Sequence, residues 1–255
     1  MRFASLGSGS RGNALLVEAG STRVLLDCGF AIRETVRRLE RLDVAPETLA
    51  AILVTHEHSD HIAGVFKFAR RYGLPVWLTH GTLAAAPESC GEPPALRLID
   101  GHSAYALGDL QVLPYPVPHD AREPVQYVFS DGARRLGVLT DAGGLTPHLT
   151  AMLDACDALV LECNHDSGML AASAYPPSLK RRIAGRLGHL DNDTAASLLT
   201  QVCVSRLQHV VAAHLSEQNN RVGLAAGALA SALGCSPEWI GVADQEAGFD
   251  WRQIC

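Results

Sequence analysis

The sequence predicts an α/β fold, a four-layer αβ/βα sandwich in which two mixed sheets lie face to face and helices cover their outer sides. Three observations lead to this class. Short apolar or β-branched segments first cluster as hairpins, similar segments later alternate with helical ones, and one strand–turn–strand unit occurs twice. Hydrophobic residues make up 47% of the 255-residue chain and no Pro/Ser-rich linker divides it, so we expect a single domain over residues 1–255.

The repeated unit covers residues 15–29 and residues 127–143. Each copy reads as a strand, a Gly-containing turn, a second strand and then Asp-x-Gly, and the second copy is two residues longer. Two copies of one unit indicate that the domain consists of two similar halves.

The remaining elements follow in chain order. Further strands are expected at residues 51–55, 76–79, 110–117, 158–162 and 209–213. Helices are expected around residues 33–42, 62–72, 145–155, 177–187, 192–204 and 221–233. Because functional loops leave such strands at one shared edge, we expect polar residues at the strand ends to meet there.

The composition limits the cellular setting of the protein. The first twenty residues contain no apolar run behind a basic start, and no stretch approaches about 18 uninterrupted apolar residues. The seven cysteines are scattered and form no CxxC pair. We therefore expect a cytoplasmic protein with reduced thiols and no membrane partner. The net charge of −6 argues against a uniformly basic surface that coats nucleic acid, although metal-binding carboxylates contribute to this charge.

Residues 52–64, Ile-Leu-Val-Thr-His-Glu-His-Ser-Asp-His-Ile-Ala-Gly, lead from an apolar strand into four side chains that can bind metal. His56 and His58, at i and i+2, can converge on one ion, while Asp60 and His61 can serve a neighbouring ion. Nitrogen and oxygen ligands of this kind suit zinc and also accept manganese or iron. The alternative is a polar loop in which the histidines are incidental.

These four residues complete the HxHxDH signature of the metallo-β-lactamase superfamily, which the sequence resembles through most of its length. Three later segments resemble further motifs of that family. His119 precedes a predicted hairpin, Asp141 lies in Leu-Thr-Asp-Ala-Gly, and His214 ends a late strand. Taken singly, His119 and His214 would be ordinary core or surface histidines, but their order and spacing after HxHxDH agree with the family.

The resemblance implies a binuclear site for two divalent metal ions. The implied ligands are His56, His58 and His119 for one ion, Asp60, His61 and His214 for the other, and Asp141 as a bridge. Asp60 also counts among the catalytic residues, and Asp27 is expected to fix the tautomer of a ligand histidine. Two cations about 3.5–4 Å apart would share a bridging hydroxide that attacks the substrate.

Within the superfamily, the sequence is similar to the YycJ-like (WalJ-like) branch, regarded as double-strand-specific DNA 5′ exonucleases, and more distantly to ribonuclease Z. The stretches that carry this similarity are spread along the chain, at residues 8–13, 161–166, 175–183, 188–192 and 214–220. The intervals between the later motifs are too short for a β-CASP insertion or for a tRNA-gripping arm. The resemblance therefore implies DNA as the substrate and partner.

A basic segment, Lys180, Arg181 and Arg182 with Arg186 one turn later, lies on a predicted helix. Such cations can position phosphates without reading bases. A solvated helix face is the alternative interpretation.

Five further residues are candidate contacts to the substrate. The loop that contains Ser8, Ser10 and Asn13 can offer hydroxyls and backbone N–H groups to a terminal phosphate, or it can be a plain Gly/Ser turn. Ser216 follows the last motif histidine. His165 is open between a substrate contact, a residue that supports a metal ligand, and simple packing.

His189 is the candidate general acid for the leaving group. The resemblance to ribonuclease Z implies that Glu162 acts only by orienting the His189 imidazole. The alternative for His189 is a capping or surface role, because the next residues look like a helix cap.

Two other functions remain open from the sequence. A small-molecule hydrolase for β-lactams, lactones or thiolesters would use the same metals, and a nearly apolar pocket away from the cations of residues 180–186 would favour it. Cations that converge on a groove would favour the nuclease. A non-catalytic scaffold is disfavoured because none of the ligand positions is lost.

Overall fold

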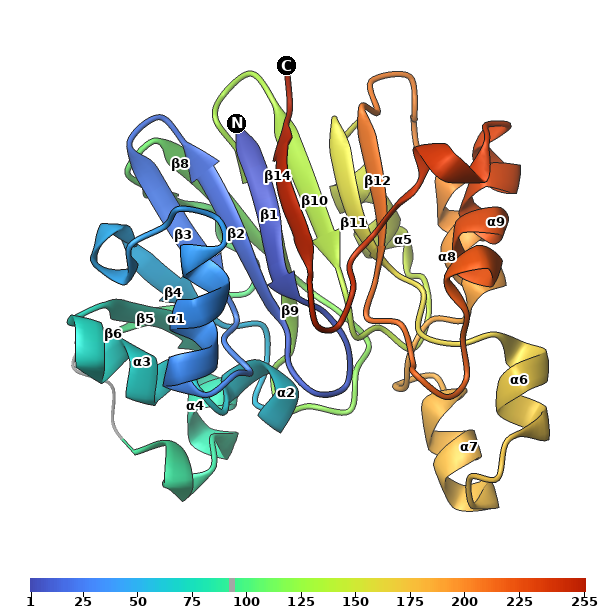
Figure 1. Cartoon of the computed structure of the whole chain (residues 1–255), viewed down its shortest axis with the longest axis horizontal. Coiled ribbons are helices and arrows are strands. Elements are labelled where there is room, and N and C mark those ends of the chain that lie inside the picture. The colour runs from blue at the N-terminus through green and yellow to red at the C-terminus, as the bar shows by residue number, and fades with distance from the viewer. Residues whose placement is uncertain (92–94) are drawn as a thin grey trace.

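The strands form two seven-stranded mixed sheets that pack face to face in the computed structural model, which describes residues 1–91 and 95–255 (Figure 1). The first sheet has the order β14-β1-β2-β3-β4-β5-β6 and the second has the order β13-β12-β11-β10-β9-β8-β7. The strands of the first sheet are β1 (Arg2–Gly7), β2 (Ala14–Ala19), β3 (Thr22–Leu26), β4 (Ala51–Leu53), β5 (Pro75–Thr79), β6 (Ala95–Ile99) and β14 (Phe249–Gln253). Those of the second are β7 (Tyr105–Leu107), β8 (Leu110–Pro116), β9 (Val125–Ser130), β10 (Arg135–Leu139), β11 (Ala158–Glu162), β12 (His209–Ala213) and β13 (Gly241–Val242).

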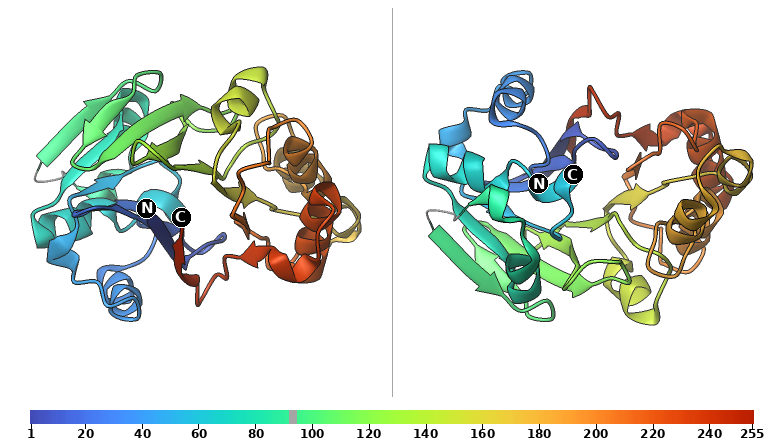
Figure 2. Two further views of the ribbon diagram at one scale, coloured as in Figure 1. Left: turned by 90° about the horizontal axis from the view of Figure 1, so that it is seen from above. Right: turned by 90° about the horizontal axis from the view of Figure 1, so that it is seen from below.

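Helices cover the outer sides of both sheets, as the views from above and below show (Figure 2). The helices before β11 are α1 (Ile32–Glu40), α2 (Ser59–Ile62), α3 (Val65–Tyr72), α4 (His80–Ala85) and α5 (Pro147–Leu153). Those after it are α6 (Ser167–Ala172), α7 (Pro177–Ile183), α8 (Asn192–Leu199) and α9 (Val222–Leu233). Short 3₁₀ turns occur at η1 (Pro46–Thr48), η2 (Glu88–Cys90) and η3 (Pro237–Trp239). Within the part of the chain that the structure describes, no helix is long and apolar enough to cross a membrane.

Three apolar clusters hold the layers together. The cluster between the sheets joins residues such as Val17 of β2 to Tyr127 of β9. A second cluster lies between the first sheet and helices α1 and α3, and a third lies between the second sheet and helices α5, α8 and α9. The strands are apolar on both faces because each sheet is covered on both sides. Successive residues of a strand, such as Leu15 and Leu16, therefore enter different clusters. The predicted four-layer fold class is confirmed.

The repeated unit of the sequence forms equivalent hairpins. Strands β2 and β3 pair antiparallel, as do β9 and β10, and each second strand then pairs in parallel with the next strand, β4 or β11. Asp27 and Asp141 follow these hairpins and both have left-handed backbone, with φ of 60° and 53°. The two Asp-x-Gly sequences therefore mark the same turn in both sheets.

Some element boundaries differ from the sequence prediction. The helix expected at residues 62–72 is divided into α2 and α3 at Gly64, where a Cβ atom would clash with the carbonyl oxygen of Phe30. The helix expected to reach residue 187 ends at Ile183, because the chain turns back and the N–H of His189 donates to the Ile183 carbonyl (2.9 Å). Strands β1 and β14, which pair antiparallel, were not predicted.

Candidate metal centre and active site

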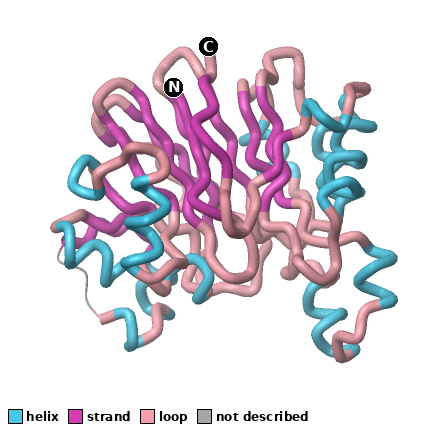
Figure 3. Tube along the Cα trace, in the orientation of Figure 1, coloured by secondary structure: helices cyan, strands magenta, loops and turns pink. Residues whose placement is uncertain are grey.

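The predicted site residues lie at one edge of the sandwich because six strands end there. Strands β3 and β4 are parallel, and β10, β11 and β12 are parallel to one another. Strand β8 runs in the same direction as β10, since each is antiparallel to β9. The C-terminal ends of these strands meet at the lower edge, where Figure 3 shows the loops gathered, and functional sites of α/β sheets form at such ends. Both chain termini lie at the opposite edge (Figure 1).

The first group of candidate ligands comprises His56, His58 and His119, whose ligand atoms lie within 4.8 Å of one another. Nδ1 of His119 donates to the carbonyl oxygen of Gly188 (3.0 Å), which leaves Nε2 with its lone pair. This Nε2 lies 3.1 Å from Nδ1 of His58. The hydroxyl of Thr55 contacts Nδ1 of His56 at 2.9 Å, so that Nε2 of His56 is also the free nitrogen. The three lone pairs can therefore converge on one cation.

The second group comprises Asp60, His61 and His214. Oδ2 of Asp60 lies 3.3 Å from Nε2 of His214 and 3.5 Å from Nε2 of His61. Asp27 fixes the other side of His61, because its Oδ2 accepts from Nδ1 at 2.8 Å and leaves Nε2 free. The ligand atoms of this second group thus also face one point.

Asp141 lies between the two groups. Its carboxylate is 3.1 Å from Nε2 of His61 through Oδ2, and 3.9 Å from Nε2 of His119 through Oδ1. Asp141 and His214 both have left-handed backbone, with φ of 53° and 55°, a conformation that non-glycine residues rarely adopt. Such strain at strand ends is typical of functional sites, where the surrounding fold holds a side chain in place.

The donor set fits divalent cations. Nε2 of His56 is buried and has no hydrogen-bond partner among the described residues, which leaves a buried polar atom unsatisfied. Such an atom costs about 1–3 kcal/mol unless a ligand satisfies it. The surrounding donors are imidazole nitrogens and carboxylate oxygens, which suit zinc, manganese or iron. A metal ion at this position would satisfy the orphaned nitrogen.

The acidic and basic ligands of the site shift the pKa values of one another. Burial by itself lowers the pKa of His214, but Asp141, Asp60 and Glu162 raise it to about 10. Burial raises the pKa of Asp60, yet the neighbouring His61 and His214 bring it below its usual value. Metal ligands must be deprotonated, so cation binding here would release protons from these histidines.

Glu162, at the end of β11, joins the metal site to the candidate acid. It is fully buried, and its Oε1 accepts from Nδ1 of His189 (2.8 Å) and from Nδ1 of His214 (3.1 Å). Its Oε2 accepts from the backbone N–H groups of Ala142 (3.0 Å) and Leu190 (3.1 Å). Burial alone would raise the pKa of Glu162, but the charge and hydrogen bonds of the histidines lower it to about 2. The expectation that Glu162 orients only His189 is therefore too narrow, because the same oxygen also holds a candidate metal ligand.

A cavity of about 390 Å³ opens onto this centre. Its walls include the candidate ligands His58, Asp60, Asp141 and His214, together with the candidate acid His189. Burial lowers the pKa of His189, but Glu162 and Asp141 raise it above its usual value, which favours the protonated form of this imidazole beside the cavity. The arrangement can therefore bind a substrate beside the metals and donate a proton to it.

The loop between β1 and β2 contributes in two different ways. Ser10 lines the cavity. Ser8 is buried instead, where its hydroxyl donates to Oδ1 of Asn13 (3.1 Å) and accepts from the N–H of His214 (2.9 Å). Nδ2 of Asn13 lies 3.3 Å from Oδ2 of Asp60. Ser8 and Asn13 thus support candidate ligands, and Ser10 is the residue of this loop placed to meet a substrate.

Of the three predicted basic residues of α7, one lines the cavity and two do not. Arg182 lines the cavity, and its Nε donates to Oδ2 of Asp120 at 2.6 Å. Lys180 donates to the carbonyl of Ala171 (2.6 Å), and Arg181 is exposed; neither lines the cavity.

His165 and Ser216 lie outside the cavity. His165 is buried, and its backbone forms an isolated parallel β-bridge with Asp191. Its Nδ1 atom has no hydrogen-bond partner among the described residues. Burial lowers the pKa of its imidazole. Ser216 caps a turn by accepting from the N–H of Asn219 at 3.1 Å.

Sequence reasoning did not assign several residues of the cavity wall to the site, namely Ser59, Asp120, Tyr175, Leu179, Ile183 and Gly188. Oδ1 of Asp120 lies 3.7 Å from Nε2 of His58 and 3.6 Å from Nε2 of His119, so this carboxylate faces the first group of ligands. Its position directly after a motif histidine was the available signal. For Tyr175, the available signal was its place at the start of the stretch 175–183, which carries part of the resemblance to the YycJ-like branch.

Comparisons with known proteins show the family and the fold of the chain. A family model described as the beta-lactamase superfamily domain matches residues 22–214. The chain is 36% identical over 227 residues to the exodeoxyribonuclease YycJ of Bacillus anthracis, covering 88% of this chain and 86% of that protein. It is 31% identical over 245 residues to the exodeoxyribonuclease WalJ of Streptococcus pneumoniae, covering 94% and 91%. The metallo-β-lactamase fold protein YhfI of Bacillus subtilis has a solved structure that matches with a TM-score of 0.75 over 98% of both chains at 16% identity, which shows a shared fold.

Proposed function

The chain belongs to the metallo-β-lactamase superfamily of hydrolases, and we propose that within it the protein is a binuclear metal-dependent phosphodiesterase that digests duplex DNA from its 5′ ends. Two relatives that cover most of the chain are named exodeoxyribonucleases, which supports DNA as the substrate. The family membership that the HxHxDH motif predicted is confirmed. We further propose that residues 1–255 form a single domain that acts in the cytoplasm.

The observation that carries this proposal is the pair of His189 and Glu162 beside the candidate ligands. The 3′ oxygen that leaves during DNA hydrolysis is a poor leaving group, and a placed general acid contributes on the order of 10²–10⁴ in rate. Glu162 accepts from Nδ1 of His189, so Nε2 is the nitrogen that holds the proton for this oxygen. Hydrolysis of a thiolester gains less from such an acid, because a thiolate is a better leaving group than an alkoxide.

The candidate ligands would hold the cations in the arrangement that the family implies. His56, His58 and His119 would hold one ion, Asp60, His61 and His214 would hold the other, and Asp141 would contact both. Two divalent ions, zinc, manganese or iron, supply Lewis-acid activation of water and of the phosphate when they are bound.

Residues around the ligands keep them in the productive state. Asp27 and Glu162 fix the imidazoles of His61 and His214 with Nε2 free. Arg182, on the cavity wall, can contact the phosphate backbone.

A panel of substrates tests the proposal. Purified protein, loaded with zinc or manganese, is incubated with 5′-phosphorylated duplex DNA, single-stranded DNA, RNA and a chromogenic lactam. We expect mononucleotides to be released from the 5′ ends of the duplex, with slower or no cleavage of RNA and the lactam. Turnover of the lactam by a metal-loaded protein that leaves all nucleic acids intact would instead establish the small-molecule hydrolase.

A further inference from the structure

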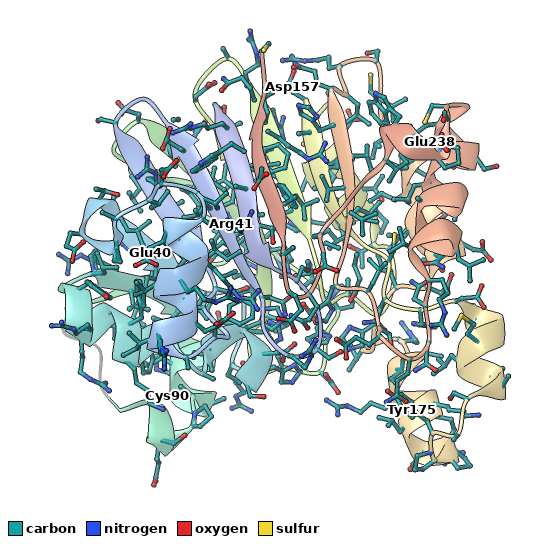
Figure 4. All side chains as sticks on the ribbon, in the orientation of Figure 1. Glu40, Arg41, Cys90, Asp157, Tyr175 and Glu238 are labelled. Carbon is teal, nitrogen blue, oxygen red and sulfur yellow. The ribbon has the colours of Figure 1, made fainter. Side chains whose placement is uncertain are left out.

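Helix α7 is unusual because it has no buried side chain, although two of its apolar residues face the catalytic cavity. Leu179, Arg182 and Ile183 all line the cavity, and their i, i+3, i+4 spacing places them on one face of the helix. Tyr175, just before the helix, extends the same wall. Helices α6 and α7 project below the body of the sandwich (Figure 1), and Figure 4 labels Tyr175 in this projecting part. Apolar side chains left half-exposed in a cavity indicate a ligand with an apolar face.

This wall belongs to the same part of the cavity as the candidate acid. The chain turns directly from α7 to His189, whose N–H donates to the carbonyl of Ile183 at 2.9 Å. The N–H of Gly188 also donates to the carbonyl of Gly185 at 2.8 Å, which closes the turn. In the proposed reaction, His189 gives a proton to the 3′ oxygen of the nucleotide that is released. The base of that nucleotide therefore lies on the α7 side of the metals.

We propose that Tyr175, Leu179 and Ile183 form a binding site for the base of the 5′-terminal nucleotide, which enters the cavity unpaired and stacks on the Tyr175 ring. This inference rests on the proposed nuclease function. The cavity of about 390 Å³ lies near the lower end of the range for small-ligand sites, about 300–1,000 Å³, which suits one nucleotide better than a base pair.

The chemistry of the wall predicts how bases are recognised. Every base has a π face, so stacking on an aromatic ring tolerates all four bases. The apolar side chains Leu179 and Ile183 add contact area without hydrogen-bond readout. Nε of Arg182 donates a hydrogen bond to Asp120. The other guanidinium nitrogens can therefore donate to the phosphate of the same nucleotide. The site would thus bind any terminal nucleotide and discriminate against an end that cannot unpair.

The test combines changes in the protein with changes in the DNA. Tyr175→Ala removes the ring, Tyr175→Phe retains it, and Ser178→Ala is the matched control, since Ser178 is exposed on α7 and does not line the cavity. Each protein is assayed on duplex DNA with a normal 5′-terminal nucleotide and with an abasic one, and metal content is measured in the same samples. Base stacking is worth about 1–3 kcal/mol, so removal of the base should lower kcat/KM of the wild type about 5- to 150-fold.

The expected pattern is a loss of coupling between the ring and the base. Tyr175→Ala should cleave normal DNA as slowly as the wild type cleaves abasic DNA, with little further loss on the abasic end. Tyr175→Phe retains the ring and should therefore retain the difference in rate between normal and abasic ends, and Ser178→Ala should behave like the wild type. A terminal mismatch should accelerate the wild type, because the end is already unpaired. Two results would overturn the inference while leaving the nuclease function intact. In one, the wild type has the same kcat/KM on normal and abasic ends; in the other, Tyr175→Ala loses as much kcat/KM on the abasic end as the wild type does.

A binding measurement separates this inference from the nuclease proposal. Metal-free protein is titrated with a duplex that carries 2-aminopurine as its 5′-terminal base, whose fluorescence falls when the base stacks. We expect quenching with the wild type, Tyr175→Phe and Ser178→Ala, and much less with Tyr175→Ala. Equal signals from wild type and Tyr175→Ala would exclude stacking on this ring, whatever the substrate panel shows about cleavage.

Discussion

Replacement of Glu162 by Gln changes one atom of a side chain that accepts four hydrogen bonds. Two come from the imidazoles of His189 and His214, and two come from backbone N–H groups. A Gln side chain offers one acceptor oxygen and one donating NH₂ group. It can satisfy either the imidazole pair or the backbone pair, but its NH₂ group must then face the other two donors.

Both orientations of the Gln side chain are costly. If the amide nitrogen faces the imidazoles, Nδ1 of His214 must become an acceptor, and the proton moves to Nε2, the nitrogen next to Asp60. That tautomer cannot bind metal through Nε2. If the amide nitrogen faces the backbone, two buried N–H groups lose their acceptor, at about 1–3 kcal/mol each.

We therefore expect Glu162→Gln to weaken the metal site as well as the acid. Loss of a hydrogen-bond partner behind a ligand histidine typically costs about 10- to 100-fold in metal affinity. Loss of an oriented acid costs on the order of 10²–10⁴ in turnover of DNA. The variant should thus bind metal less tightly than His189→Ala, which removes the acid and leaves the Glu162 bond to His214 in place.

The assay is a competitive metal titration with a fluorescent chelator, combined with kcat on DNA at saturating metal. Asp157→Asn is the matched control. Asp157 is buried directly before the same strand, accepts from the N–H of Arg135 (2.7 Å), and lies at the opposite end of the sandwich (Figure 4). This control should lower the melting temperature without changing metal affinity. Unchanged metal affinity in Glu162→Gln would refute the reasoning, because His214 would then not depend on Glu162.

Three further variants test separate parts of the site. Asp141→Ala should reduce the metal content from about two ions per chain and abolish turnover, because one carboxylate faces both ligand groups; a fully loaded, active variant would contradict the ligand assignment. His189→Ala should keep both metals, lower DNA hydrolysis on the order of 10²–10⁴-fold and spare a nitrophenyl phosphodiester, whereas DNA turnover within about three-fold of wild type would reduce His189 to a capping residue. Arg182→Ala should raise KM for DNA and flatten its salt dependence, while Lys180→Ala and Arg181→Ala, which change residues outside the cavity wall, should do so much less; equal loss on a small phosphodiester would indicate structural damage.

The sequence was sufficient for the features that depend on local spacing. The HxHxDH segment follows an apolar strand directly, and the geometry of a strand end brings residues two to five positions apart toward one point. The repeated hairpins are likewise visible, because two apolar segments and the turn between them occur within about fifteen residues. For this reason the fold class and the family could be predicted from the chain alone, while the assignment of each ligand stays a prediction.

Only the tertiary structure decided which distant residues share a function. Strand β14 joins β1 across almost the whole chain, and Glu162 contacts His214 and His189 at sequence separations of 52 and 27 residues. Tyr175 and Arg182 line the cavity at the strand ends, whereas the neighbouring Lys180 donates to the carbonyl of Ala171 instead. Residue type and spacing determine local geometry, but the packing of the two sheets determines which strand ends meet, and no local pattern encodes that.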